Sequence, residues 1–176
     1  KFPENIDYRS KQEIKTYQHE KLQEILQYVN HNSKFYQELF KKHKIDILSI
    51  KTLEDLQKLP FTEKDDLHKR NDDFICVEKS KIVDYITTSG TLGDPVTFAL
   101  TNADLDRLAY NECKSFKISD GNSEDIYQLM VTLDRRFMAG LAYFLGIKKL
   151  GAGMVRVGNG MVELQWDTIQ RIKPNA

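Results

Sequence analysis

Most features that mark a disordered, membrane-spanning or disulfide-stabilised chain are scarce in this sequence of 176 residues. The 26 basic side chains equal the 26 acidic ones, so binding to nucleic acid or to anionic membranes loses its usual electrostatic basis. No apolar run reaches the roughly 20 residues that a transmembrane helix needs, and the stretch Met138–Ile147 has ten. Two cysteines, Cys76 and Cys113, make neither a disulfide framework nor a metal pattern. We expect a cytoplasmic protein that binds neither nucleic acid nor a membrane.

Glycine is missing from the first half of the chain: all nine glycines lie at or after Gly90, and all four histidines lie at or before His68. The histidines offer no i, i+4 ligand pair, so we predict no metal site. The length suits about one domain. A helical N-terminal segment over residues 1–80, followed by an α/β region over residues 81–176, accounts for where the glycines fall.

The first half reads as a series of capped helices. Ser10 and Glu13 form a capping-box pattern, and the apolar residues that follow are spaced as one helical stripe, which should pack against something: Ile14, Tyr17, Leu22, Ile25, Leu26 and Val29. Three further helix starts are predicted, at Ser33, at Thr52 with Asp55, and at Thr62 with Asp65.

The second half alternates between strand and helix patterns. Strands are predicted over residues 82–87, 96–100, 126–131 and 154–157, and helices from Thr101 with Asp104, from Asp134 to Lys149, and from Met161 to Ile172. Such alternation favours a largely parallel sheet flanked by helices. One more strand would be expected where the sequence ends, so we predict an incomplete sheet.

The segment Thr87–Pro95 places hydroxyl side chains and two glycines between two predicted strands. Glycine lets a backbone approach a ligand closely, and successive amides in tight turns can bind an anion. Hydroxyls add donors of the kind that phosphate oxygens accept. No Gly-Lys-Ser/Thr sequence follows, so this is not a Walker A loop. An ordinary polar hairpin turn uses the same residue types.

The run Thr88–Val96 resembles the phosphate-binding signature of adenylate-forming enzymes. Phe35-Tyr36, then Leu59–Leu67, then this loop are similar in order to the opening of phenylacetate–CoA ligases. Lys149–Gly153 and the ending Lys173-Pro174 match as well. The resemblance covers essentially the whole chain, and because members of that family are considerably longer, it implies the N-terminal portion of their large domain.

This resemblance implies an ATP-dependent carboxylic acid–CoA ligase, with ATP, Mg²⁺ and coenzyme A as its cofactors. Residues 81–176 would be the first part of an α/β nucleotide-binding domain. The β- and γ-phosphates would be held by one loop, made of Thr88, Ser89, Gly90, Thr91, Leu92 and Gly93. The ribose-binding aspartate and the catalytic lysine of the family would lie outside these residues, so we predict that this chain alone makes no acyl-CoA.

The substrate implied by the resemblance is a small carboxylic acid, expected to be aromatic, and Phe137 falls where a wall of the acyl pocket would lie. Phe137 could equally be a core residue of an amphipathic helix. Two departures from the family pattern bear on phosphate binding: Leu92 replaces a usual threonine and removes one hydroxyl, and Asp94 replaces the common lysine with a negative charge that should weaken the binding. They motivate an alternative, a non-catalytic or vestigial nucleotide-binding and oligomerisation module. The apolar stripes and the resemblance are compatible with a homodimer.

Overall fold

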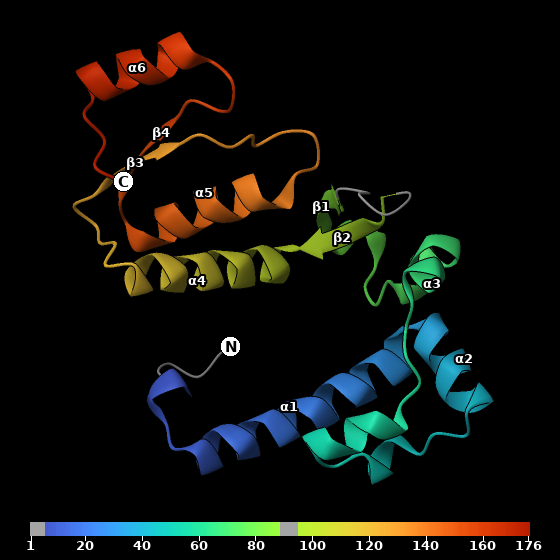
Figure 1. The fold of residues 1–176 in the computed structure, drawn as a ribbon. Coiled ribbons are helices and arrows are strands. Elements are labelled where there is room, and N and C mark those ends of the chain that lie inside the picture. The colour runs from blue at the N-terminus through green and yellow to red at the C-terminus, as the bar shows by residue number, and fades with distance from the viewer. Residues whose placement is uncertain (1–5, 89–94) are drawn as a thin grey trace. The chain divides into compact units, whose positions relative to one another are not determined.

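The computed structural model describes residues 6–88 and 95–176. The chain divides into two compact units, Lys1–Val77 and Glu78–Ala176. Within the described residues the first unit is helical, and all the strands belong to the second (Figure 1). The predicted fold class, a helical N-terminal segment followed by an incomplete α/β region, is confirmed.

Two long helices dominate the first unit, α1 (Lys11–Asn32) and α2 (Lys34–Lys42). The predicted capping box starts α1: the Glu13 amide donates to Ser10 Oγ at 3.3 Å, and the Ser10 amide donates to the Glu13 carboxylate at 3.0 Å. The apolar stripe is narrower than its sequence spacing suggests, since Ile25 remains 51% exposed.

Ser33 lies between α1 and α2 and caps both helices. Its amide donates to the Val29 carbonyl at the end of α1, and its hydroxyl oxygen accepts from the Tyr36 amide in the first turn of α2. The same hydroxyl donates to the Asp73 carbonyl at 2.8 Å. Ser33 is fully buried, so this cap is part of the interior. The predicted start of the second helix is confirmed.

The other helices of the described first unit are short: η1 (Ile6–Tyr8), η2 (Ile47–Ser49), η3 (Leu53–Lys58), α3 (Lys64–Lys69) and η4 (Asn71–Phe74). The Thr52–Asp55 capping box is present, but the segment it opens is a 3₁₀-helix. The predicted cap at Thr62 is wrong by one residue: Glu63 is the N-cap, and its amide donates to Asp66 at 2.9 Å. Both candidate caps have an aspartate three residues later, so the spacing alone did not separate them.

The core of the first unit joins both long helices to the segment after η2. Leu22 and Leu26 of α1, Phe40 of α2 and Ile50 form one buried cluster. Five partly buried residues pack around it: Val29, Tyr36, Ile45, Ile47 and Leu59. Burying such apolar surface is the main force that holds these helices together, because it removes that surface from water.

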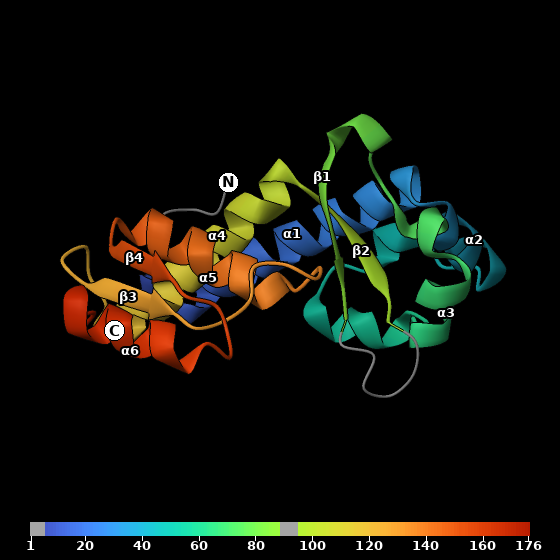
Figure 2. The same cartoon turned by 90° about the horizontal axis from the view of Figure 1, so that it is seen from above.

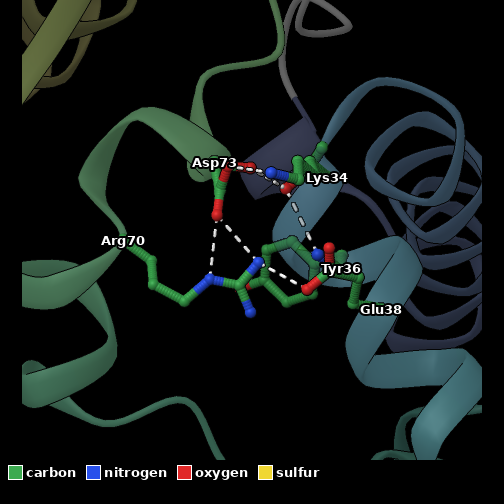
Figure 3. Close-up of polar contacts among 6 residues, drawn as sticks. Lys34, Tyr36, Glu38, Arg70 and Asp73 are labelled. Carbon is green, nitrogen blue, oxygen red and sulfur yellow. Dashed lines mark hydrogen bonds and ion pairs between the residues drawn. The ribbon is translucent and has the colours of Figure 1, made fainter.

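A charged network ties η4 to α2 (Figure 3). Arg70 Nε donates to Asp73 at 2.8 Å, and Arg70 Nη2 donates to Glu38 at 2.6 Å. The guanidinium also lies over the Phe35 ring, 5.2 Å from its centroid. Arg70 holds the pKa of Asp73 below its usual range, and Asp73 and then Glu38 raise the pKa of Arg70. Lys34 adds a second cation 3.4 Å from Asp73.

Two small sheets form in the second unit. The antiparallel pair is β1 (Ile82–Thr87) with β2 (Thr97–Thr101), and the parallel pair is β3 (Ile126–Leu129) with β4 (Gly153–Arg156). A short connection can join only antiparallel neighbours, whereas parallel strands need a long crossover, here through α5 (Met138–Leu150). A 3₁₀-turn, η5 (Lys79–Lys81), precedes β1.

Helices cover the parallel pair on both faces. The α5 helix lies on one face and α6 (Val162–Arg171) on the other (Figures 1 and 2). The helix α4 (Asn102–Ile118) begins at the predicted capping box of Thr101 with Asp104 and packs along α5. Beside β3, the Ala176 amide donates to the Ile126 carbonyl at 3.3 Å, and the Gln128 amide donates to the Ala176 carbonyl at 2.8 Å.

Candidate functional site

The predicted phosphate loop joins β1 to β2, and the structure describes its two ends. Thr88 follows β1 directly, and Val96 precedes β2. The other predicted loop residues lie outside the described residues: Ser89, Gly90, Thr91, Leu92 and Gly93.

Thr88 closes the base of the hairpin through both its backbone and its side chain. Its amide donates to the Val96 carbonyl at 3.0 Å, and its Oγ1 accepts from the Val96 amide, also at 3.0 Å. Val96 is buried, and Thr88 is exposed. A threonine hydroxyl that accepts one bond still carries a hydrogen to donate. Thr88 can therefore donate a hydrogen bond to a phosphate oxygen, and the residue is exposed to solvent.

The second predicted element, Phe137, comes immediately before α5. The structure corrects the predicted start of this helix from Asp134 to Met138, because Arg135 and Arg136 have φ angles of 59° and 60°. Those left-handed conformations cannot continue a right-handed helix. Phe137 keeps 45% of its surface exposed, so it is not part of the buried core of the described unit.

One hydrogen bond brings the two predicted regions together. The Thr87 amide, at the end of β1, donates to the Arg136 carbonyl at 3.1 Å. Thr88 and Phe137, far apart in the sequence, are each the next residue along the chain from this bond. This bond could not be predicted from the sequence, since nothing marks an arginine pair as left-handed and a backbone contact between distant segments has no motif.

The segment that carries Arg136 packs against the first turn of α5. Gly140 lies so close to Thr132 that a Cβ added to the glycine would be 1.8 Å from the Thr132 carbonyl oxygen. Thr132 in turn donates its hydroxyl to the Asp134 carboxylate. The absence of a side chain at Gly140 therefore permits the close approach of α5 to Thr132, in the segment whose Arg136 carbonyl is bonded to β1.

In the segment before α5, Arg135 and Arg136 carry positive charge and Asp134 carries negative charge. The Arg135 side chain lies 3.9 Å from the Asp134 carboxylate. Within residues 6–88 and 95–176, the guanidinium of Arg136 takes part in no ion pair, and its side chain is exposed. The same described residues contain no group of three or more His, Cys, Asp or Glu side chains arranged to hold a metal ion.

Curated relatives share this sequence over almost its whole length. The chain is 30% identical over 174 residues to a phenylacetate-coenzyme A ligase of Aromatoleum evansii, covering 98% of this chain and 39% of the relative. The chain is related to the phenylacetate–CoA ligases. The phenylacetate-coenzyme A ligase of Escherichia coli strain K12 is 26% identical over 171 residues. The resemblance drawn from the sequence is confirmed, and it concerns the N-terminal part of these phenylacetate–CoA ligases.

Solved structures share the fold. A 2-hydroxyisobutyryl-CoA ligase, solved in complex with 2-HIB-AMP and CoA, superposes with a TM-score of 0.83 at 23% identity, covering 94% of this chain and 36% of that one. The chain thus spans about two-fifths of the length of the relatives and structures that it matches. No family model matches it. Among the described helices, none combines the length and the apolar character that crossing a membrane demands.

Proposed function

We propose that this chain is the N-terminal portion of an ATP-dependent acid–CoA ligase. The observation that carries the proposal is the 30% identity to a phenylacetate-coenzyme A ligase over 98% of the chain. In this proposal residues 81–176 are the first part of the nucleotide-binding domain, and residues 1–80 are its helical N-terminal segment. Both are regions of one cytoplasmic enzyme.

The reaction would proceed in two steps. A carboxylate oxygen of the acid attacks the α-phosphate of ATP and pyrophosphate leaves, which gives an acyl adenylate. The thiol of coenzyme A then attacks the acyl carbon, AMP leaves with the bond electrons, and the thiol proton goes to solvent or to a base. Adenylation turns a poor leaving group into a good one. The chain's own contribution is to position the phosphates and to stabilise their charge, with no covalent step.

The hairpin loop, Thr88 to Gly93, would hold the β- and γ-phosphates. Thr88 supports this role because it is an exposed residue at the closed base of the hairpin and its hydroxyl keeps a hydrogen to donate. Coenzyme A would be the acyl acceptor. Magnesium, which the relationship implies, would enter with ATP, and we assign it no ligand among the described residues.

Phe137 would form part of the acyl pocket. Its exposed ring lies one residue from the Arg136 carbonyl that is bonded to β1, so an acid beside Phe137 would lie near the hairpin base. An aromatic ring favours an aromatic or other apolar acid, because both surfaces then leave water. We therefore propose an aromatic carboxylic acid as the substrate.

The test is carboxylate-dependent exchange between ATP and pyrophosphate by the intact protein that contains this chain, with aryl and aliphatic acids offered in parallel. We expect exchange that requires an acid and is fastest with an aryl acid. No exchange with any acid would favour the alternative, a vestigial nucleotide-binding or oligomerisation module. Leu92 and Asp94, which depart from the family pattern, are the reason to consider that alternative. The isolated chain should make no acyl-CoA, and thioester formation by it would contradict that prediction.

A further inference from the structure

The base of the hairpin has a neighbour that no sequence motif assigns. The Thr87 amide donates to the Arg136 carbonyl at 3.1 Å, and Thr87 immediately precedes Thr88. The backbone of Arg136 is therefore fixed beside the first residue of the proposed phosphate loop. The long side chain of an arginine carries a planar, permanently charged group that suits phosphate oxygens.

The loop itself brings no positive charge to a polyanion. The sequence Thr88–Pro95 contains no Lys or Arg, and its one charged residue is Asp94. Mg²⁺ that enters with ATP would neutralise only part of the triphosphate's charge, so a cation from elsewhere in the fold would stabilise the remaining negative charge beside Asp94. Arg136 is the arginine whose backbone is bonded to the strand that leads into this loop.

The neighbouring arginine differs from Arg136 in its surroundings. Arg135 lies 3.9 Å from the Asp134 carboxylate, so part of its charge is already balanced. Among the described residues Arg136 is in no ion pair, and its side chain is exposed to solvent, so its charge is available to a ligand. Both residues have left-handed φ angles, a conformation that a residue other than glycine keeps only where its surroundings impose it.

We propose that Arg136 binds a phosphate group of the nucleoside triphosphate beside Thr88 and supplies the cation that the hairpin sequence lacks. This inference rests on the proposed function, because it assigns one more residue to the same nucleotide site. It also explains how a loop with Asp94 in place of a lysine can serve a triphosphate.

The test compares four variants of the intact protein. Arg136→Gln removes the charge, Arg136→Lys keeps it, and Arg136→Gly removes the side chain while favouring the same left-handed backbone. Arg135→Gln is the matched control from the same turn. The dissociation constants of ATP and of inorganic pyrophosphate are measured by calorimetry without any acid, and the KM values for ATP and for the acid by exchange.

Loss of a charge-assisted bond to phosphate should weaken ATP and pyrophosphate binding about 10-fold in Arg136→Gln and Arg136→Gly. Arg136→Lys should stay closer to the unmodified protein, while Arg135→Gln and the KM for the acid should change less than about 2-fold. Unchanged ATP affinity in Arg136→Gln, or weakening in Arg136→Gln but not in Arg136→Gly, would overturn the inference alone. If the unmodified protein neither binds ATP nor exchanges pyrophosphate, the proposed function fails first, and this inference fails with it.

Discussion

Gly146 of α5 packs directly against Glu112 of α4: a Cβ added to the glycine would lie 2.3 Å from the Glu112 Cβ and 3.1 Å from the Glu112 carbonyl carbon. These atoms belong to the helix backbone or are attached to it, so a side chain at position 146 would force the two helices apart. Gly146→Ala should therefore destabilise the chain. Overpacking costs up to about 3 kcal/mol, and alanine regains about 1 kcal/mol of helix propensity, which leaves a loss of about 2 kcal/mol in urea unfolding.

A double-mutant cycle separates this clash from other effects. Glu112→Gly removes the nearest atom, so Glu112→Gly with Gly146→Ala should be more stable than the sum of the two single changes. Simple additivity of the two changes would show that the close approach is not what limits position 146.

Ser33→Ala should be the more costly of two serine-cap replacements. The change removes the acceptor for the Tyr36 amide and the donor to the Asp73 carbonyl inside a buried site, so we expect a loss of about 2 kcal/mol. Ser10→Ala is the matched control, an exposed cap of the same kind, and should cost about 0.5–1 kcal/mol. Equal losses in urea unfolding would contradict the buried role of Ser33.

Acid should weaken the first unit through Asp73. Arg70 holds the pKa of this carboxyl below its ordinary value of 3.8, so the contact stabilises the fold above about that pH and is lost as the pH falls through the lowered pKa. Asp73→Asn should lower the urea midpoint at pH 7 and make it less dependent on pH below 4. Asp72→Asn is the control with the same charge change, and a similar response in both would remove Arg70 as the cause.

Thr88 can be tested with two near-isosteric replacements. Thr88→Val keeps the shape but removes the oxygen that accepts from the Val96 amide, which should cost about 1 kcal/mol in urea unfolding and weaken ATP binding. Thr88→Ser keeps the hydroxyl and should retain both properties. If Thr88→Val bound ATP as tightly as the unmodified protein, this hydroxyl would have no part in the phosphate site.

Phe137→Ala should alter the choice of acid more than stability, because nearly half of the residue's surface is exposed. We expect the KM of the intact protein for an aryl acid to rise roughly 10-fold while the KM for ATP changes little. Met138→Ala, a similar truncation at the next residue and of similar exposure, is the control. A large drop in melting temperature with unchanged acid preference would indicate a packing role instead.

Local signals predicted local structure well. The capping boxes at Ser10 and Thr101 each start a helix where the spacing places it, because such a cap involves only residues three apart. The start of α5 was wrong, since the left-handed pair Arg135 and Arg136 follows from packing and not from the preference of arginine. The bond from Thr87 to Arg136 lay beyond sequence reasoning for the same reason, and the loop 89–94 stays a prediction.

The connection between α1 and α2 consists of Ser33 alone, because this single residue ends one helix and begins the next. An α-helix turns by about 100° per residue, so one inserted residue would swing Phe40 away from Leu22 and Leu26. The packing of α2 on α1 therefore depends on the number of residues in this connection as much as on the identity of their side chains.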